Sequence, residues 1–370
     1  MLLVALYVVG TAAASAQEVY VANYGDGDVS VLDATTLTTI TRIPVTDVAD
    51  PALPVTGYPS AVVLSADHAL AFVALSFGSH VAVIDTATKA VVDYIEVVPV
   101  SFDALIFVHP NGRNLYVTSC AEPVISVVDV KSRAMTASIA LPGGTYPMAF
   151  SRNGQTGYAG NGYAGCGAVN GIHRLDLSKN TASGFIPTTV PVTDLAISPI
   201  GDFALATGGN GVVVVDLAKN VETGAVKCGL APCTYAYSGG LAFNAAGTRA
   251  YLVDFHGNTL STINTDPASA QFLQELSRIP VLAGIDEYAW QVEVREDIAV
   301  VLVMGFPGHV ISYDVSTDVP VLLSVNQVGT YAYELDMWSS PSSSDACKNS
   351  GWVSFETFRN YGSCVVSAKD

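Results

Sequence analysis

Charged side chains are scarce in this 370-residue chain, and basic ones are the scarcest. Charged residues make up 13% of the sequence, and 16 Lys and Arg stand against 33 Asp and Glu, so the net charge is −17 at pH 7. No cluster of Lys or Arg occurs. Because nucleic-acid backbones and anionic lipid surfaces repel such a chain, neither is an expected partner. Cations, neutral glycans and basic proteins stay as candidates.

Catalytic and cofactor signatures are also missing. The chain has no G-x-S-x-G, H-E-x-x-H, S-x-x-K, C-x-x-C or C-x-x-C-H motif. GNGYAG matches G-x-G-x-x-G, but a strand pattern follows it, whereas a dinucleotide site needs a helix there. YGDGDVS offers Asp26 and Asp28 without the later ligands of a calcium loop. We therefore expect no cofactor and no metal.

No apolar run reaches the length of about 20 residues that a membrane-spanning helix needs. The uncharged start, MLLVALYVVGTAAASA, ends on Ala14-Ser15-Ala16 before Gln17, which fits a signal-peptidase site. A Lys or Arg at its beginning is missing, and a retained membrane anchor is the alternative. We predict a signal peptide at residues 1–16 and a secreted or cell-surface protein.

The six cysteines agree with export, because an even number in an exported chain is most simply explained by disulfides. Their spacings suggest two pairs, Cys228–Cys233 and Cys347–Cys364. By elimination, Cys120 pairs with Cys166.

The main positive feature of the sequence is an internal repeat of strand patterns. Apolar runs that close on Asp or Asn recur 40 to 52 residues apart, and they end at Asp33, Asp85, Asp129, Asp176, Asp216, Asn264 and Asp314. Most are preceded by two further strand patterns around a polar turn, as in LIFVHPNGRNLYV, and followed by another, as in AMTASIAL. Four short strands in a unit of roughly 40–50 residues are typical of a propeller blade.

The recurring Asp has a structural explanation. It ends the third strand of each unit, where its carboxylate can accept hydrogen bonds from backbone N–H groups two residues further on. Seven equivalent positions indicate a turn-forming residue and argue against catalysis at these carboxylates.

These units resemble the YVTN β-propeller repeat of surface-layer and related secreted proteins. The matching segments are VYVAN (Val19–Asn23), LYVTS (Leu115–Ser119), VAVIDTATKAVV (Val81–Val92), and the turns SPIG (Ser198–Gly201) and HPNG (His109–Gly112). The resemblance covers about residues 18 to 338 and implies an all-β propeller. Two units depart from the pattern, one by His-Arg within its third strand and one by Asn264 in place of Asp.

Seven units predict seven blades. The first unit begins at its second strand, at Val19, so its first strand is missing. The segment Thr330–Met337 follows the last unit and can fill this place, which would close the ring and remove an open sheet edge. We therefore predict a seven-bladed propeller over residues 17–338, closed by a C-terminal strand that joins the N-terminal blade.

The remaining C-terminal residues divide into a Ser/Pro linker at 339–346 and a short module at 347–370. This module resembles a cysteine-bounded tail found in secreted bacterial proteins. The matching residues are Cys347, Lys348, Gly351, Trp352, Phe355, Phe358, Asn360, Gly362, Cys364 and Val365, whereas Ser350 and Tyr361 depart from it.

The candidate binding residues lie just before the predicted inner strands, on one rim of the channel. They are Tyr58, Phe102, Asp103, Tyr146, Asp194, Tyr237, Glu287, Tyr288, Tyr331 and Tyr333. Rings and carboxylates of this kind can hold a cation, a sugar or a basic peptide. Alternatively, the rings pack between the blades and have no ligand.

Four histidines, at 80, 173, 256 and 309, precede or begin third strands in different blades, so we expect most of them to lie too far apart to share a metal. His68 and His109 lie at the opposite turns and are expected to be structural.

Two hypotheses for the function follow, because a propeller fold alone does not decide. The first is a non-enzymatic exported propeller that binds a protein, glycan or cation at the rim, or serves the cell surface. The alternative is a lactonase-like hydrolase, since such enzymes resemble this repeat class, with Asp103, Asp194, Glu287 and Glu334 as catalytic candidates. A dehydrogenase subunit ranks last, because no haem or quinone signature occurs. The sequence leaves the oligomeric state open.

Overall fold

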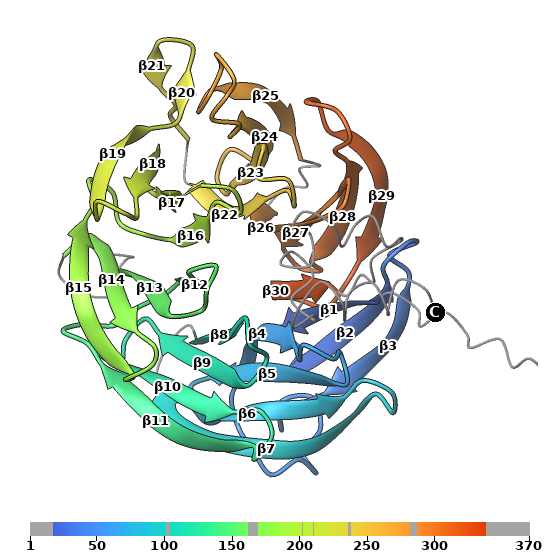
Figure 1. Ribbon diagram of the computed structural model, residues 1–370. Helices are drawn as coiled ribbons and strands as arrows, with labels where there is room; N and C mark the ends of the chain where they lie inside the picture. The colour runs from blue at the N-terminus through green and yellow to red at the C-terminus, as the bar shows by residue number, and fades with distance from the viewer. Residues whose placement is uncertain are drawn as a thin grey trace, which may run out of the picture.

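The computed structural model shows seven four-stranded antiparallel sheets arranged as blades around a central axis (Figure 1). It describes residues 18–100, 104–161, 169–201, 203–209, 211–235, 238–281 and 287–337. Within these ranges, no helix is long and apolar enough to cross a bilayer. Several predictions lie outside the described residues: the signal peptide at 1–16, Phe102, Asp103, Cys166, Tyr237, the linker at 339–346 and the module at 347–370 with Cys347 and Cys364.

Each blade places its first strand innermost and its fourth strand at the outer edge. From inside to outside, blade 1 holds β30 (Ala332–Met337), β1 (Glu18–Asn23), β2 (Asp28–Asp33) and β3 (Thr39–Pro44). Blade 2 holds β4 (Tyr58–Leu64), β5 (Leu70–Ser76), β6 (Gly78–Asp85) and β7 (Ala90–Val100). Blade 3 holds β8 (Ala104–Val108), β9 (Asn114–Ser119), β10 (Val124–Asp129) and β11 (Ala134–Ala140). Blade 4 holds β12 (Met148–Phe150), β13 (Thr156–Asn161), β14 (Gly171–Asp176) and β15 (Thr181–Pro187).

The other three blades repeat this order. Blade 5 holds β16 (Asp194–Ile197), β17 (Phe203–Gly208), β18 (Gly211–Asp216) and β19 (Val221–Ala225). Blade 6 holds β22 (Ser238–Phe243), β23 (Arg249–Asp254), β24 (Thr259–Asn264) and β25 (Glu275–Pro280). Blade 7 holds β26 (Tyr288–Arg295), β27 (Ile298–Met304), β28 (His309–Asp314) and β29 (Val321–Gln327). A small hairpin of β20 (Lys227–Cys228) and β21 (Ala231–Pro232) extends between blades 5 and 6 (Figure 1).

The repeated acidic residue sets the same register in every blade. In all seven, the last residue of the third strand pairs with the first residue of the second strand, as Asp33 does with Glu18. Its side-chain oxygen accepts a hydrogen bond from a backbone N–H two or three residues on, in every blade. These bonds stabilise the charged form, so the pKa of Asp33, for example, lies below its usual value. The predicted turn-forming role is confirmed.

The hydrophobic core lies between the blades. Among the described residues it divides into seven clusters, and each is shared by two neighbouring blades. Tyr20, Tyr116 and Tyr251 occupy equivalent positions on second strands and are almost fully buried in three of these clusters. Burying such rings removes a large apolar area from water, which explains how a ring of separate sheets holds together.

The ring closes by pairing of its two ends, as predicted. β30 pairs antiparallel with β1, with Val19 opposite Met337. The residues before β30 are also fixed: the Gly329 N–H donates to Asn23 Oδ1 at 3.1 Å, and the Thr330 N–H donates to Asp26 Oδ2 at 2.9 Å. Asp26 also forms an ion pair with Arg42 of β3. The acidic β1–β2 turn therefore joins the outer strand of blade 1 to the end of the propeller.

Candidate functional site

The predicted rim tyrosines of blades 1 and 2 converge around a ring that was not among the predicted residues. Tyr24, directly after β1, stacks on Tyr58 with 4.8 Å between ring centroids. It also lies 5.7 Å from Tyr333 and 6.1 Å from Tyr331. Thus three of the predicted residues share one central neighbour.

Further aromatic side chains extend this group toward blades 6 and 7. The Trp290 ring is 5.3 Å from Tyr333 and 5.4 Å from Phe255. Phe255 stacks on Tyr288 at 4.7 Å, and His256 lies beside both. We call this continuous set the aromatic arc, and with Phe77 at one end and Phe306 beside Tyr331 its members are Phe77, Tyr58, Tyr24, Tyr331, Phe306, Tyr333, Trp290, Phe255, Tyr288 and His256.

Parts of the arc face solvent. Phe306 is 73% exposed, Phe77 49% and Tyr58 36%, whereas Tyr333 is buried. Exposed aromatic side chains joined into one surface are a feature of binding sites, since isolated ones are common on any protein.

Most members of the arc that were not predicted lie at the ends of second strands, whereas Trp290 lies on the inner strand β26. Tyr24, Phe77 and Phe255 directly follow the second strand of their blades, and Phe306 follows two residues after it. The signal was present in the sequence, because Tyr24, Phe77 and Phe255 come right after the segment that matches or replaces YVTN, and Phe306 comes one residue later. The ends of second strands and the starts of first strands lie on the same rim, since neighbouring strands are antiparallel.

Glu287 lies next to the arc and has a defined environment. Its Oε1 is 3.2 Å from His309 Nδ1. Its backbone carbonyl accepts a hydrogen bond from Asn258 Nδ2 at 2.7 Å, and Asn258 Oδ1 accepts one from the Ala289 N–H. These contacts hold the start of β26 against blade 6.

Tyr146 differs from the other predicted tyrosines. It is 3% exposed and packs in the cluster shared by blades 2 and 3, and its carbonyl accepts a hydrogen bond from Thr118 Oγ1. Tyr146 is therefore a packing residue between blades, and its prediction as a ligand contact is not supported by its position.

Two of the predicted catalytic carboxylates, Asp194 and Glu334, lie at the inner strands and interact with each other. Burial raises the pKa of Asp194 to about 6, although the backbone N–H groups of Leu195 and Leu241 oppose this. Burial also raises the pKa of Glu334, and the negative charge of Asp194 adds to it. Raised pKa values in a pair of neighbouring carboxylates are a feature of active sites, which makes Asp194 and Glu334 candidates for catalysis.

The hydrogen bonds of these carboxylates, however, connect neighbouring blades. Asp194 Oδ2 accepts from the Leu241 N–H of blade 6 at 2.7 Å. Asp336 Oδ2 accepts from the Leu64 N–H of blade 2 at 2.8 Å. Between Glu334 and the next blade, Gln291 donates to the carboxylate at 3.3 Å and accepts from the Leu335 N–H at 2.8 Å. Half-buried acids at these positions link the inner strands of neighbouring blades.

The histidines are dispersed. His173 is buried and bonds Asn161, His80 bonds Ser79, and His256 and His309 have the neighbours given above. His109 accepts from the Asn111 N–H and lies 2.7 Å from the Gly154 carbonyl, which agrees with the structural role expected of it.

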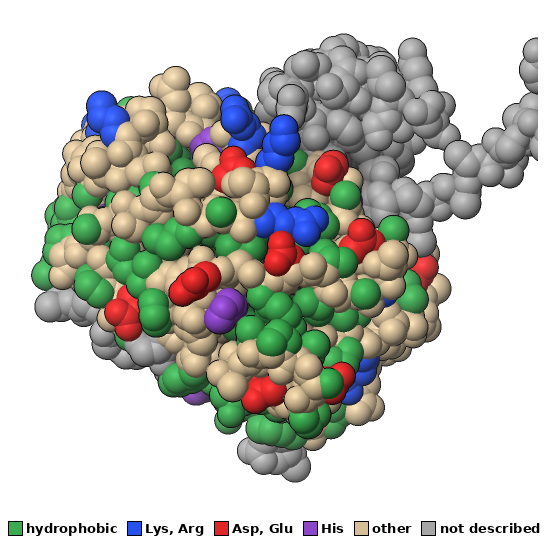
Figure 2. Space-filling model, turned by 90° about the horizontal axis from the view of Figure 1, so that it is seen from below, with side chains coloured by type: hydrophobic (Ala, Val, Ile, Leu, Met, Phe, Trp, Pro, Cys, Tyr) green, Lys and Arg blue, Asp and Glu red, His purple; other side chains and the backbone are tan. Residues whose placement is uncertain are grey.

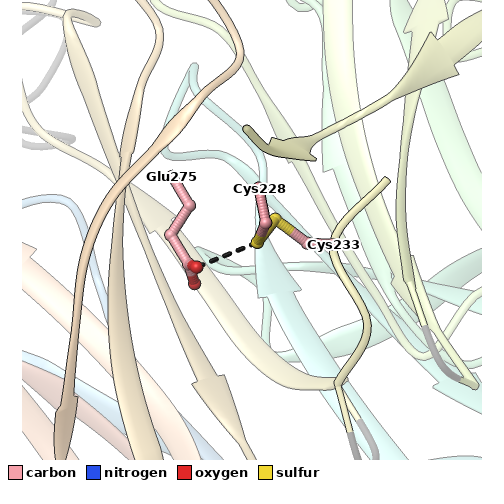
Figure 3. A group of neighbouring side chains, drawn as sticks. All are labelled: Cys228, Cys233 and Glu275. Carbon is pink, nitrogen blue, oxygen red and sulfur yellow. Dashed lines mark hydrogen bonds between the residues drawn. A yellow bond between two sulfur atoms is a disulfide. The ribbon is translucent and has the colours of Figure 1, made fainter. Parts of the chain in front are cut away.

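One group of potential metal ligands is found among the described residues: Cys228, Cys233 and Glu275 (Figure 3). The two cysteines form the predicted disulfide, so their sulfur atoms are not free as thiolates. Glu275 Oε2 lies 2.9 Å from Cys228 Sγ, while Arg278 Nε donates to Glu275 Oε1 at 2.8 Å. With the disulfide formed, Cys228 of the β20–β21 hairpin lies against Glu275 and Arg278 of β25. Cys120 is also disulfide-bonded, and its predicted partner Cys166 is outside the described ranges.

On the face in Figure 2, patches of hydrophobic side chains lie between charged side chains of both signs, and the charged groups are scattered among the described residues. The aromatic arc is therefore the candidate site that the described residues support best.

No protein-family model matches the chain, and no curated protein sequence is similar to it. Among solved structures, hydrazine synthase of Kuenenia stuttgartiensis is similar with a TM-score of 0.62 and 17% identity, over 76% of this chain and 90% of that one. Dihydro-heme d1 dehydrogenase NirN, in a complex with DHE, has a TM-score of 0.59 and 13% identity, over 87% of this chain and 74% of that one. At these identities the likeness concerns the fold, and the chain is a seven-bladed β-propeller.

Proposed function

We propose that this protein is an exported, YVTN-type propeller that binds a neutral carbohydrate at the aromatic arc and catalyses no reaction. The observation that carries the proposal is the arc itself, a continuous set of rings that spans blades 2, 1, 7 and 6 and includes the exposed side chains of Phe306, Phe77 and Tyr58. Aromatic rings stack on the apolar faces of sugars, and tyrosine hydroxyl groups bond to sugar hydroxyls.

A neutral ligand is favoured because the acidic groups beside the arc already have partners. Asp26 pairs with Arg42 and accepts two hydrogen bonds from Thr330. Glu287 faces His309. A cation or a basic peptide would have to compete with these partners, so the negative charge of the whole chain does not translate into a local site for positive ligands.

A carbohydrate is favoured over an apolar peptide by the composition of the arc. Half of its ten members are tyrosines: Tyr24, Tyr58, Tyr288, Tyr331 and Tyr333. Each combines a ring with a hydroxyl group, which matches a ligand that has both ring faces and hydroxyls. A purely apolar peptide would leave hydroxyl groups unpaired on binding.

Export is supported by the signal-like residues 1–16 and by the Cys228–Cys233 disulfide, since disulfides persist in oxidising compartments. Membership of the YVTN-type repeat is supported by the segments VYVAN and LYVTS together with the recurring turn residue. Whether the mature protein is released or held at the cell surface is a question for fractionation.

The experiment is a glycan array followed by titration calorimetry with the neutral oligosaccharide that binds best. Tyr58→Ala removes a stacked, exposed ring, and we expect affinity to fall about tenfold or more. The matched control is Phe185→Ala, because Phe185 is similarly exposed, at 38%, but lies on blade 4 away from the arc. Equal losses in both variants, or binding of charged glycans alone, would contradict the proposal.

A lactonase-like hydrolase is the second candidate, and the raised pKa values of Asp194 and Glu334 favour it. Its test is hydrolysis of a panel of lactones by the wild type and by Glu334→Gln. We expect no turnover above the buffer rate in either. Turnover that is lost in Glu334→Gln but kept in Tyr58→Ala would establish the hydrolase instead.

A further inference from the structure

A cleft of about 550 Å³ opens at the blade 2 end of the aromatic arc. Phe77 belongs to both, since its ring lies 6.3 Å from Tyr58 and also lines the cleft. The other lining residues come from the loop before β4 and from β6 and β7: Pro54, Val55, Thr56, Gly78, Ser79, His80, Pro99 and Val100. A volume of this size is within the range of small-molecule sites.

The base of the cleft is formed by two backbones in direct contact. A Cβ atom on Gly57 would lie 3.0 Å from the Ser76 carbonyl oxygen, and one on Gly78 would lie 3.0 Å from the Thr56 carbonyl oxygen. Gly57 has a φ of +130°, which side chains rarely adopt. Because two glycines permit this approach, the loop and the β5–β6 turn support each other, and the cleft is preformed.

Phe77 is held in an unfavourable backbone conformation. It is the one residue between β5 and β6, and its φ is +58°. Five other non-glycine residues with positive φ lie four positions after a turn Asp, where the turn requires this conformation: Leu37, Lys89, Arg133, Asn180 and Asn220. Phe77 is outside that pattern, as are His68, Asn258, Leu273, Glu296 and Tyr331. A strained, exposed aromatic residue at a cleft is an observation that points to a ligand.

The lining indicates the kind of ligand. Pro54, Val55, Pro99 and Val100 provide apolar walls, and none of the lining residues in the part of the chain that the structure describes is an acid, a lysine or an arginine. The polar groups are few, with Ser79 Oγ 3.3 Å from His80 Nδ1. An unsubstituted sugar has hydroxyl groups on most of its carbons, and these would lose hydrogen bonds to water against the apolar walls without gaining partners.

We infer that this cleft is the end subsite for the glycan that lies along the arc, and that it takes a sugar carrying a small acyl substituent, such as an N-acetyl group. The methyl group of the substituent would contact the apolar walls, and its amide would bond near Ser79 and His80. This inference rests on the proposed function, because the same chain must also contact the arc.

The experiment compares two neutral β-1,4-linked series of equal length that differ at C2: oligomers of N-acetylglucosamine and oligomers of glucose. For the wild type we expect the acetylated series to bind at least about tenfold more tightly. Phe77→Ala should reduce this ratio to about twofold or less, because the ring forms one side of the cleft. His80→Ala is a second cleft variant with the same expected direction.

Phe306→Ala is the matched control, since Phe306 is an exposed ring of the arc that does not line the cleft. It should weaken both series and leave their ratio unchanged. If the wild type binds both series equally and Tyr58→Ala weakens both, the cleft inference is wrong and the proposed function stands. If the wild type binds neither series nor any other neutral glycan, the proposed function itself fails.

Discussion

The rim of the propeller has two different halves. In blades 6, 1 and 2 an aromatic residue directly follows the second strand, as Phe255 and Tyr24 do, and in blade 7 Phe306 follows after Gly305. At the equivalent position, directly after the second strand, blade 3 has Cys120 and blade 5 has Gly209. The seven turn residues and the seven clusters between blades are shared by both halves, so the fold does not require rings at this position.

The half with small residues is closed by its loops. The Thr145 N–H donates to the Ser119 carbonyl at 3.1 Å, and a Cβ atom on Gly144 would lie 1.8 Å from the Cys120 carbonyl oxygen. In blade 5, a Cβ atom on Gly208 would lie 1.4 Å from the Pro191 carbonyl oxygen. Loops before the inner strands lie on the ends of the second strands in both halves, since the Tyr24 N–H also donates to the Tyr331 carbonyl at 3.1 Å. The halves differ in the side chain that follows the second strand: Phe77 in blade 2 is 49% exposed, whereas Cys120 in blade 3 is 4% exposed. We therefore call blades 6, 7, 1 and 2 the accessible half of the rim.

The largest effect that tests this comparison is expected from Gly208→Ala. Its methyl group would overlap the Pro191 carbonyl, so the loop must move and lose the hydrogen bond from Thr193 to Thr207. We expect the free energy of unfolding to fall by about 3 kcal/mol in chemical denaturation.

Gly211→Ala is the matched control for this variant, because Gly211 pairs with Gly208 across the same hairpin and a Cβ atom added to it would have no other atom within 4 Å. Its stability should stay within about 0.5 kcal/mol of the wild type. A similar small change for Gly208→Ala would mean that the loops of this half are not tightly packed.

The second prediction concerns the half-buried Asp194 in blade 5. Because its pKa in the folded protein, about 6, is above the unfolded value of 3.8, the folded state binds its proton more tightly. This contribution to stability is fully present below about pH 4 and is lost as the pH rises through 6. Asp194→Asn removes the charge and keeps one acceptor oxygen, for the Leu241 N–H of blade 6, while the adjacent Leu195 N–H loses its bond to the side chain.

Above pH 6 we therefore expect Asp194→Asn to be more stable than the wild type by about 2–3 kcal/mol, with little difference at pH 4. The measurement is urea denaturation of both proteins from about pH 4 to 8. A variant that is less stable than the wild type at the alkaline end would show that the charged carboxylate is stabilising in place.

The two halves of the rim also show which features of the structure can be predicted from the sequence. The spacing of the turn residues was sufficient for the seven blades, because register and hydrogen bonding at each turn are local. The closure by β30 followed from the strand count, since the first unit lacks a first strand and one extra strand follows the last unit. Tyr58 and Tyr146 were not distinguishable, since both come just before an inner strand. Tyr58 is 36% exposed and stacks on Tyr24, whereas Tyr146 is 3% exposed and packs in the cluster shared by blades 2 and 3. Contacts of this kind join segments that are apart in the chain and leave no local pattern.

The third prediction separates the contributions of the ring and of the hydroxyl group of Tyr24 to glycan binding. Tyr24 contacts three other rings, so Tyr24→Ala should weaken glycan binding about tenfold to thirtyfold, whereas Tyr24→Phe should weaken it only a few-fold. Calorimetry measures both, and thermal unfolding checks that the variants are folded. Equal losses would place the main interaction on the hydroxyl group and would argue against stacking.

The smallest effect is expected where the repeat itself departs from Asp, in blade 6. Asn264 Nδ2 donates to Ser269 Oγ at 3.0 Å, and its Oδ1 accepts from the Asp266 N–H at 3.0 Å. Asn264→Asp restores the common turn residue but removes the donor and brings a second charge near Asp266. We expect it to lower stability by about 1 kcal/mol, measured by denaturation at neutral pH. An increase would show that the common Asp is the better residue in every blade, so that the exception in blade 6 has no structural cause. The expected loss would show that Asn264 stabilises the longer turn between β24 and β25 through its bonds to Ser269 and Asp266.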